Sequence, residues 1–392
     1  MERDYDFAII GAGIIGSAIA RELVNRKRVS VVVIEKEREP GMHASGRNSG
    51  VIHSGFNYKS GTLKAKLCVE GNSLLLKYCR ERGVPFEQCG TLVVSRTEQE
   101  RRRLETLLAQ GTQNGVPGIR IIDRAELVRK EPLAEGTHAL FSPTGSIVDS
   151  QALVTSIVQD SIDKGAEYVY TVKVNAINRG VVITNKGEIR ANHVINAAGL
   201  YADRLAHSEG IGMDYQVVAI RGEYRIIEGL SINSMIYSPH NPDLPFLGVH
   251  LTKRMGGSVI AGPTATIARG RESYDGKIQF KDLGELIFSR AFWKMATSHD
   301  MQTAASYYRK LTRSREFYAD EINSLITSRV RPDQLKPFRP GNRAQVIDGD
   351  GKLVEDFIVI PSKRATHIIN AVSPGLTSSL SFAKYIVDNY LR

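Results

Sequence analysis

The residues best suited to chemistry near the start of the chain are three glycines and a carboxylate. Gly11, Gly13 and Gly16 have the spacing G-x-G-x-x-G, and Glu35 follows about 20 residues later. Such glycines allow a tight turn and a close approach of backbone to a pyrophosphate, while the acid accepts hydrogen bonds from an adenosine ribose. Because no arginine replaces the acid, a 2′-phosphate would be repelled. The pattern predicts dinucleotide binding and leaves NAD and FAD both open.

The flanking sequence predicts the elements that position this fingerprint. Phe7 to Ile10 suit a buried parallel strand, and Ser30 to Ile34 suit its neighbour. Apolar residues between positions 15 and 23 fall on one face of an intervening helix. The N-terminal N–H groups and the positive dipole end of that helix would face the phosphates.

Further helices and strands follow a loop rich in glycine and serine. We expect helices at 63–78, ended by Gly83 in a left-handed cap, and at 151–164. Another helix should begin with a capping box of Ser95 and Glu98. The predicted strands are Cys89 to Ser95, Tyr168 to Ala176, Val181 to Asn185 and Val194 to Ala197, with a hairpin turn at Asn178, Arg179 and Gly180.

Composition favours an ordinary water-soluble protein without a metal centre. The 392 residues allow two domains with cores of their own, and no run of about 18 apolar residues predicts a membrane span. The N-terminus lacks a secretory pattern, so we expect a cytoplasmic protein. Cys68, Cys79 and Cys89 are too few and too spread for a zinc site or a disulfide framework. We expect them to be reduced and partly buried.

The net charge of +10 favours anionic partners, and much of it lies between Met301 and Arg343. A solvated helix face and docking on the acidic surface of a membrane are both compatible with this stretch. No nucleic-acid-binding motif and no aromatic run interleaved with lysines accompanies it, which argues against a dinucleotide-binding protein that serves mainly to bind nucleic acid.

Six further segments, together with the fingerprint, resemble FAD-dependent L-2-hydroxyglutarate dehydrogenases and oxidases, within the larger D-amino-acid-oxidase-like group of flavoproteins. The segments are GRNSGVIHSG (46–55), LKAKLC (63–68), CGTLVV (89–94), NAAGLYADRLA (196–206), PFLGVHLTKRM (245–255) and RAQVIDGDGKLVEDF (343–357). The resemblance covers nearly the whole chain. It implies FAD as the cofactor and oxidation of a CH–OH group as the activity.

One segment departs from that family. Where its members read close to SPAATSS, this chain has SPGLTSS from Ser373 to Ser379, which is more similar to FAD-dependent glycerol-3-phosphate dehydrogenases. That second family also shares the R-G-E-Y stretch at 221–224 and the G-P-T turn at 262–264. Because the resemblance implies that the 373–379 turn lies against the flavin, both substrates stay open.

Oxidation of a secondary alcohol needs a base, a hydride acceptor and cations that align an anionic substrate. His53 is the candidate base, since the resemblance places the equivalent histidine over the flavin. His250 is the rival base or a hydrogen-bond donor to the substrate. Ser373 is a third candidate at the turn. A structural role remains the alternative for each of them.

Arg254 is the predicted clamp for a carboxylate or phosphate, because a guanidinium binds such groups in a bidentate fork. Lys253 lies beside it in sequence, and Arg221 is a further candidate cation. Tyr237 is the fourth residue that we assign to substrate binding. A surface position is the alternative for the pair at 253–254, and an ion pair within its strand is the alternative for Arg221.

The remaining candidates bind the cofactor. The three glycines should hold the pyrophosphate and Glu35 the ribose. We expect further contacts along the phosphates, adenine, ribityl chain and flavin ring from Ser45, Arg47, Asn48, Val174, Gly199, Gly375, Leu376 and Thr377.

These observations predict an α/β fold with a Rossmann-like FAD-binding domain of the glutathione-reductase type and a discontinuous substrate domain built on a mixed or antiparallel sheet. The expected FAD-binding domain comprises 1–85, 145–215 and 340–392, and the substrate domain 86–144 and 216–339. The predicted reaction is oxidation of L-2-hydroxyglutarate to 2-oxoglutarate, with electrons passing to quinone or oxygen. Glycerol-3-phosphate dehydrogenation is the alternative, and amine or amino-acid oxidation a more distant one. Contact with the cytoplasmic face of a membrane is a further expectation.

Overall fold

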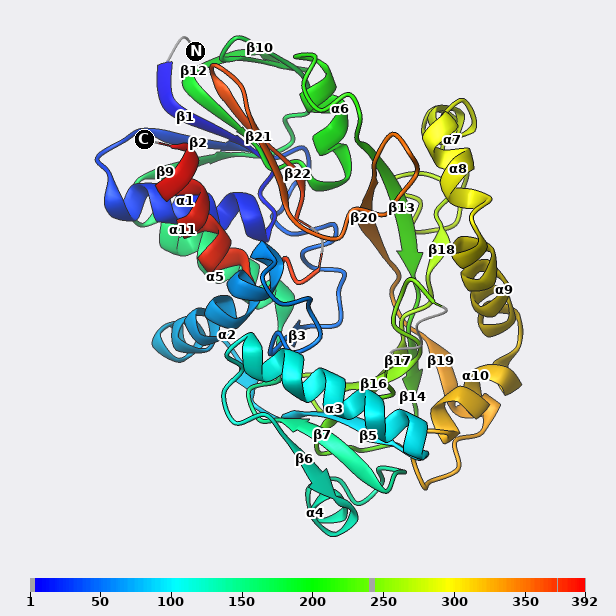
Figure 1. The fold of residues 1–392 in the computed structure, drawn as a ribbon. Helices are drawn as coiled ribbons and strands as arrows, with labels where there is room; N and C mark the ends of the chain where they lie inside the picture. The colour runs from blue at the N-terminus through cyan, green and yellow to red at the C-terminus, as the bar shows by residue number, and fades with distance from the viewer. Residues whose placement is uncertain (1–3, 240–243, 372, 392) are drawn as a thin grey trace.

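The computed structural model describes residues 4–239, 244–371 and 373–391. It has the mixed α/β architecture that the sequence predicts, with one large sheet beside the two chain ends and a second one on the far side of the molecule (Figure 1). Among the described residues no helix is long and apolar enough to cross a membrane.

The first sheet contains the predicted dinucleotide-binding strands. Its strands in spatial order are β10 (Val174–Asn178), β11 (Val181–Thr184), β12 (Gly187–Asn196), β1 (Asp4–Ile10), β2 (Val31–Ile34) and β9 (Ala166–Val169), while β22 (Ala365–Asn370) pairs with the end of β12 and β21 (Ile358–Pro361) pairs with β22. The pairs joining β9, β2, β1, β12 and β22 are parallel. Strand β1 ends at the fingerprint, so the carboxyl edge of this sheet faces the ligand site.

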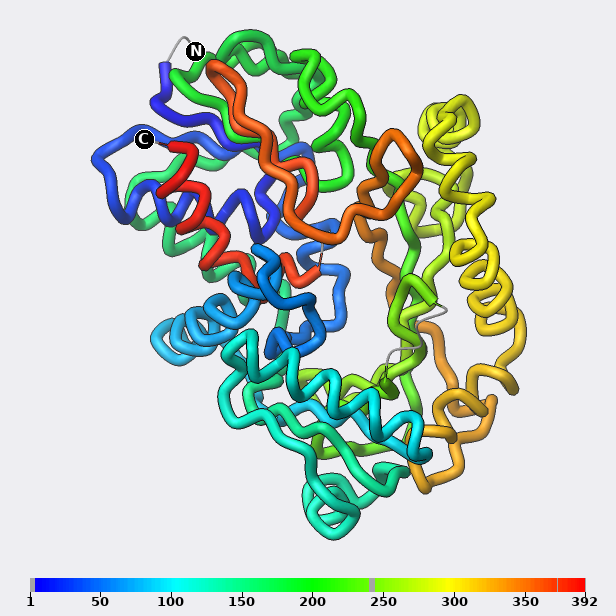
Figure 2. The backbone as a smooth tube through the Cα atoms, in the orientation of Figure 1, coloured from blue at the N-terminus to red at the C-terminus, as the bar shows by residue number. Residues whose placement is uncertain are grey.

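Helices from distant parts of the chain cover one face of this sheet. They are α1 (Ile14–Arg26), α2 (Leu63–Arg82), α5 (Ser150–Ile162) and α11 (Ser379–Tyr390). Ile19 of α1, Ile157 of α5 and Phe382 of α11 share one buried core. In Figure 2 the first and last segments of the chain lie side by side. The other face carries η1 (Gly199–Tyr201) and α6 (Ala202–His207).

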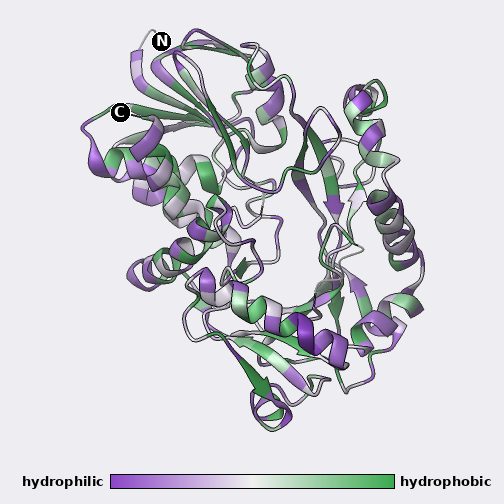
Figure 3. Cartoon of the chain, in the orientation of Figure 1, coloured by the Kyte–Doolittle hydropathy of each residue, from purple (hydrophilic) through white to green (hydrophobic). Residues whose placement is uncertain are grey.

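The second large sheet is mostly antiparallel. Its order is β19 (Leu335–Pro337), β14 (Arg225–Ile227), β17 (Val259–Gly262), β16 (His250–Lys253), β15 (Met235–Tyr237), β5 (Thr91–Ser95), β7 (His138–Ser142) and β6 (Arg120–Asp123). Two smaller sheets adjoin it: β18 (Thr266–Ile267), β13 (Gln216–Gly222) and β20 (Gly341–Ile347), and β3 (Val51–Ile52), β8 (Ser146–Val148) and β4 (Phe86–Glu87). Figure 3 shows apolar residues concentrated on the strands of the sheets.

The remaining helices flank these sheets. They are α3 (Glu98–Gln113), α4 (Arg124–Lys130), α7 (Phe280–Ile287), α8 (Arg290–Ala296), α9 (His299–Arg313), α10 (Arg315–Asn323) and η2 (Pro332–Gln334). Tyr308 of α9 and Tyr318 of α10 are buried in the core of the second sheet. The first part of the basic stretch, from Met301 to Asn323, therefore folds as α9 and α10, each with a buried face.

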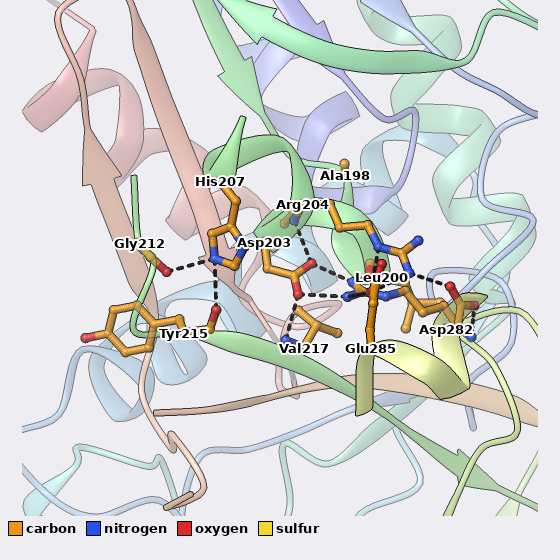
Figure 4. A network of polar contacts seen from close by, with 12 residues as sticks. Ala198, Leu200, Asp203, Arg204, His207, Gly212, Tyr215, Val217, Asp282 and Glu285 are labelled. Carbon is orange, nitrogen blue, oxygen red and sulfur yellow. Dashed lines mark hydrogen bonds and ion pairs between the residues drawn. The ribbon is translucent and has the colours of Figure 1, made fainter. Parts of the chain in front are cut away.

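A buried network of ion pairs joins α6 to the segment that follows β18 (Figure 4). Arg271 bonds both carboxylate oxygens of Asp203, at 2.5 and 2.9 Å, and also donates to the carbonyl oxygen of Leu200. The Arg271 and Asp203 side chains are only 6% and 2% exposed. Arg204 bonds the carboxylate of Glu285 on α7 at 2.6 Å. These charges tie α7 to the helix that follows β12.

Three details of the predicted elements are wrong. The expected strand from Tyr168 to Ala176 is two strands, because Thr171 adopts a left-handed φ of 58° and donates its N–H to Glu37. Helix α3 is capped by Thr97 rather than by a box starting at Ser95. Strand β12 is longer than expected and begins at residue 187.

Other details agree with the sequence. Gly83 ends α2 with a left-handed φ of 65°, and the turn at 178–180 joins the antiparallel pair β10 and β11. Cys68 and Cys79 are buried, Cys89 is half-buried, and all three are free.

Candidate active site

A cavity of about 1560 Å³ is lined by residues of the first sheet, of the second large sheet and of the small sheet that contains β13 and β20. Its walls come from distant stretches of the chain, mainly within 10–15, 34–64, 172–175, 197–205, 222–265, 341–356 and 368–377. Typical small-molecule pockets measure about 300–1,000 Å³, so this cavity has room for an extended dinucleotide together with a substrate.

The fingerprint glycines form one end of the cavity. A Cβ at Gly11 would lie 2.7 Å from the carbonyl oxygen of Ala197, and a Cβ at Gly16 would lie 2.1 Å from that of Gly11. Gly11 and Gly13 line the cavity, whereas Gly16 does not. Helix α1 begins directly after Gly13. The N–H of Ile14 donates to Ser45, so the anion site is left to the following N–H groups of the first turn. This cradle fits a pyrophosphate, and a side chain at Gly11 or Gly16 would collide with the backbone that forms it.

Glu35 lies at the end of β2, also on the cavity wall. One carboxylate oxygen accepts the N–H of Ala12 at 2.8 Å, and the other accepts the N–H of Glu37 at 2.9 Å. Each oxygen keeps a lone pair for a ribose hydroxyl. Val174, at the start of β10, lines the same end.

The loop at 41–50 supplies three further predicted cofactor residues, all on the cavity wall. Ser45 accepts the N–H of Ile14 at the start of α1, at 2.9 Å. Arg47 lies 4.2 Å from the ring centre of Tyr274. Asn48 donates to the carbonyl oxygen of Ser45 and accepts from Ser150, so its amide is occupied in fixing the loop.

The turn before α11 forms another part of the wall. Residues 375–377 and Gly199 line the cavity, and so does Ser373. Ser373 shares a hydrogen bond with the hydroxyl of Tyr58, whose pKa is raised mainly by burial. The predicted cofactor residues, with the exception of Gly16, thus gather on one continuous wall.

Two histidines, His53 and His250, line the cavity. His53 follows β3, and His250 begins β16, where it stacks on Tyr237 with 4.3 Å between ring centres. Burial lowers the pKa of both histidines to about 4. The Nδ1 of His250 donates to the carbonyl oxygen of Gly248 at 3.1 Å, which leaves Nε2 of the neutral ring as an acceptor. Both imidazoles are therefore neutral bases at physiological pH.

Arg343 on β20 is a site residue that the sequence did not single out. It lines the cavity, and its Nε has no hydrogen-bond partner among the described residues. Burial lowers its pKa, and no described carboxylate pairs with it. The groups that act on its charge are the hydroxyls of Tyr58, Tyr224 and Tyr308. An unpaired buried guanidinium on a cavity wall is suited to a carboxylate or phosphate ligand.

Lys64 is a second cation on the wall that the sequence did not single out as a site residue. Its Nζ lies 5.5 Å from the ring centre of Tyr58. Burial lowers its pKa to about 8, and the charge of Arg343 contributes, while Asp356 opposes the shift. Two cations that repel each other in one buried space are stabilised when an anion binds between them.

The three cations predicted from the sequence do not line the cavity. Lys253 pairs with Glu87 at 2.6 Å, and Arg254 lies 4.5 Å from the ring centre of Phe338. Arg221 pairs with the carboxylate two residues further on at 2.8 Å and donates to two backbone carbonyl groups. The geometry therefore favours Arg343 over these residues as the substrate cation.

A cluster of ligand-type side chains lies near the ribose end of the cavity. Glu37, His43 and Glu272 place their ligand atoms within 4.8 Å of one another. The ammonium of Lys36 donates to both carboxylates and lies 2.9 Å from the imidazole. Because Lys36 already supplies the positive charge, these groups are satisfied as an ion-pair cluster.

Comparison with known families agrees with this geometry. The model of the DAO family, described as FAD dependent oxidoreductase, matches residues 6–389. The L-2-hydroxyglutarate dehydrogenase of Indibacter alkaliphilus is 36% identical over 99% of both chains. The Escherichia coli enzyme of that name is 33% identical over 98% of this chain and 92% of its own, and the mitochondrial one of Nematostella vectensis is 36% identical over 98% and 90%.

Solved structures share the fold. L-alpha-glycerophosphate oxidase from Mycoplasma pneumoniae, with FAD bound, superposes with a TM-score of 0.77 at 23% identity, covering 98% of this chain and 94% of that one. Glycine oxidase from Geobacillus kaustophilus gives a TM-score of 0.71 at 19% identity, covering 98% and 94%. The glycine cradle, the acid at the end of β2 and the long cavity fit the FAD that the sequence predicted. The chain is therefore a member of the DAO family of FAD-dependent oxidoreductases.

Proposed function

We propose that the protein oxidises the C2 hydroxyl group of L-2-hydroxyglutarate to the ketone of 2-oxoglutarate. The proposal rests mainly on Arg343 and Lys64, two cations on the cavity wall without an ion-pair partner among the described residues. A dicarboxylate matches two cations. The relatives with the same activity in their names cover nearly the whole chain.

In the proposed reaction, His53 removes the hydroxyl proton. Its imidazole is neutral because burial holds its pKa near 4, and a neutral ring nitrogen accepts a proton in the transition state. FAD, when bound, supplies the acceptor for the hydride that leaves C2. His250, which lines the same cavity, orients the substrate oxygen through its Nε2. The assignment of base and orienting group to these two residues is ours.

The two cations hold the carboxylates. Arg343 suits the carboxylate next to C2, because its planar fork fixes the plane of that group and therefore the direction of the C2–H bond. Lys64 suits the distal carboxylate, which needs charge more than orientation. Tyr58 is near both cations, since its ring centre lies 5.5 Å from the Nζ of Lys64 and its hydroxyl acts on the charge of Arg343.

The reduced enzyme must pass its electrons to an acceptor, for which we propose quinone or oxygen. Contact with the cytoplasmic face of a membrane would serve the first of these. We also propose that residues 1–85, 145–215 and 340–392 form the FAD-binding domain and that residues 86–144 and 216–339 form the substrate domain.

Glycerol 3-phosphate is the second candidate substrate. The turn at 373–379 favours it, and that turn lines the cavity. The phosphate would take the place of one carboxylate at Arg343. In this reading Lys64 has no second anionic group to bind, which is why we favour the dicarboxylate.

An anaerobic experiment distinguishes the two. The purified yellow protein is mixed with L-2-hydroxyglutarate or with glycerol 3-phosphate, and the flavin absorbance is followed. We expect rapid bleaching by the hydroxy acid alone. Bleaching by glycerol 3-phosphate alone would refute the proposed substrate, and bleaching by neither would refute the proposed activity.

Matched variants test the cation assignment. Arg343→Met should raise the substrate concentration for half-maximal bleaching by at least about a hundredfold, since a charge-assisted bidentate pair is lost. Arg254→Met, which removes the same charge outside the cavity, should leave that concentration unchanged. Equal effects of the two substitutions would contradict the role of Arg343.

A further inference from the structure

Helix α7 exposes two large apolar side chains and buries a carboxylate. Phe280 and the residue that caps the helix, Phe288, are 83% and 90% exposed, and Ile287 is 48% exposed. On the opposite face Asp282 is buried, and it accepts hydrogen bonds from Arg204 and from the N–H of Arg271. A surface helix of a globular protein ordinarily turns its large apolar side chains toward the core, as α7 does with Leu286 but not with Phe280 and Ile287. The ion-pair network of Figure 4 is what satisfies the inward carboxylates.

The exposed apolar side chains form one surface. Positions 280, 287 and 288 lie on one face of α7, because residues seven and eight apart are neighbours after two turns. We call the exposed apolar side chains of this region the α7–α8 patch; its members are Ile278, Phe280, Ile287, Phe288 and Trp293. Helices α7 and α8 lie at the outer edge of the molecule (Figure 1). Soluble monomers rarely expose several large apolar side chains together unless the surface binds something.

Basic side chains surround this patch. Lys281 and Arg290 are exposed and make no ion pair with any described carboxylate, while Lys277 pairs with Asp275 at 3.1 Å. Lys294 pairs with a carboxylate of the 348–351 turn. A second copy of this surface would bring these cations against one another, which disfavours a symmetric dimer through the patch. The surface complements an anionic one.

We propose that the α7–α8 patch binds the surface of a lipid bilayer that contains anionic lipids. Phe280 and Phe288 insert into the boundary between headgroups and acyl chains, and Trp293 lies at the headgroup level. Lys281 and Arg290 contact lipid phosphates. The protein thus lies on the bilayer without crossing it.

The location of the patch places a docked bilayer beside the cavity. The consequence for electron transfer rests on the proposed function. The cavity extends to Lys281, Lys294 and Met301, so its rim and the patch adjoin each other. An acceptor dissolved in the bilayer therefore reaches the cavity beside the docked helices. A water-soluble acceptor would need no such surface.

Sedimentation with lipid vesicles tests the docking. The FAD-loaded protein is mixed with vesicles of phosphatidylcholine, or of phosphatidylcholine and phosphatidylglycerol in equal parts, and the bound fraction is measured at increasing salt. We expect binding to the anionic vesicles that weakens with salt. The Phe280→Gln/Phe288→Gln variant should bind at least about tenfold more weakly, because two large apolar groups no longer leave water.

Two controls match these changes. Val128→Gln/Ile162→Gln removes exposed apolar side chains from α4 and α5 and should bind like the unmodified protein. Arg290→Glu should weaken binding several-fold, whereas Arg102→Glu, with the same change of net charge on α3, should not. Equal losses in the control variants would show that the patch is not the docking surface.

Other outcomes would also overturn the inference. Unmodified protein that stays in solution with anionic vesicles would refute docking. A dimer in sedimentation velocity that the Phe280→Gln/Phe288→Gln variant converts to a monomer, without vesicle binding, would assign the patch to a second copy of the chain. Bleaching by substrate in solution is measured separately on the same variants, so failure of the proposed reaction and failure of docking are distinguished.

Discussion

The backbone N–H of His53 donates a 2.9 Å hydrogen bond to the hydroxyl oxygen of Thr377, which joins the loop after β3 to the turn before α11. The carbonyl oxygen of His53 in turn accepts from the amide of Asn72 at 3.0 Å. Both backbone groups of the proposed base are thus fixed by buried side chains. The backbone of His53 is held between the C-terminal turn and α2.

Replacing Thr377 by valine should therefore reduce the rate of substrate oxidation. The methyl group keeps the shape but cannot accept the N–H of His53, so the base shifts and the rate should fall about tenfold or more. The free energy of unfolding should fall by about 1–3 kcal/mol, since a buried N–H is left without a partner. Thr377→Ser keeps the hydroxyl and should retain most of the rate. Equal rates for the valine and serine variants, in stopped-flow bleaching, would contradict this role.

The pH dependence of kcat/KM should show two limbs. Below the pKa of about 4 of His53 the base is protonated and activity is lost, while between pH about 5 and 7 the profile should be flat. Above the pKa of about 8 of Lys64 the ammonium loses its charge, so KM for a dianionic substrate should rise. Lys64→Met should raise KM at neutral pH and abolish the alkaline limb. An alkaline limb that persists in this variant would assign it to another group.

The same histidine makes stability depend on pH. The pKa of His53 is about 4 in the folded protein against 6.5 for the free side chain, so the unfolded chain takes up its proton first. Its contribution to the free energy of unfolding is complete above pH 6.5 and is lost as the pH falls toward 4. The free energy of unfolding, measured by denaturant titration at several pH values, should depend less on pH in His53→Gln than in the unmodified protein across this interval. An equal dependence on pH in the two proteins would show that other groups cause it.

Replacing Glu35 by glutamine should weaken FAD binding. The two carboxylate oxygens accept different backbone N–H groups, and an amide turns one of these contacts into an N–H facing an N–H. We expect the dissociation constant of FAD to rise roughly tenfold or more, as measured by flavin fluorescence. Glu39→Gln changes an exposed acid four residues away and should have no effect. Equal affinities in the two variants would exclude the carboxylate as a cofactor contact.

Replacing Asp203 by asparagine should be strongly destabilising. Arg271 is left as a buried cation with half of its bidentate pair, which costs about 3–5 kcal/mol. Asp333→Asn removes the partner of Arg331 in an exposed pair and should cost less than about 1 kcal/mol. Denaturant unfolding of the two variants measures the difference. A loss of less than about 1 kcal/mol in Asp203→Asn would contradict the prediction and would mean that water solvates Arg271 in the variant.

The cofactor end could be predicted because local sequence determines it. The spacing of the three glycines and Glu35 specifies a strand, a helix and a second strand within 35 residues, and β1, α1 and β2 form as expected. The 46–55 and 373–379 segments, which resemble known flavoproteins, predicted further residues of the cavity wall. The cofactor and the fold class followed from these stretches together.

The substrate cations could not be predicted in the same way. Arg254 directly follows β16, and Arg343 lies within β20. Only long-range packing decides that the first lies on Phe338 while the second lines the cavity. Likewise the sequence assigned no role to Lys64 beyond its place in the 63–68 segment. Its lowered pKa comes from burial beside Arg343, which lies far away in sequence. Side-chain burial is a tertiary property, so neither residue type nor spacing reveals it.

The order of strands in the first sheet has a consequence for synthesis of the protein on the ribosome. Strand β22 pairs with β12, and Phe382 of α11 packs in the same core as Ile19 of α1, so the last elements complete a sheet that the first ones begin. The fingerprint therefore emerges hundreds of residues before the turn that fixes His53. A nascent chain that lacks residues 358–390 has an unfinished sheet and an open cavity, and it should retain no flavin. We therefore expect cofactor capture only in chains whose translation has passed α11.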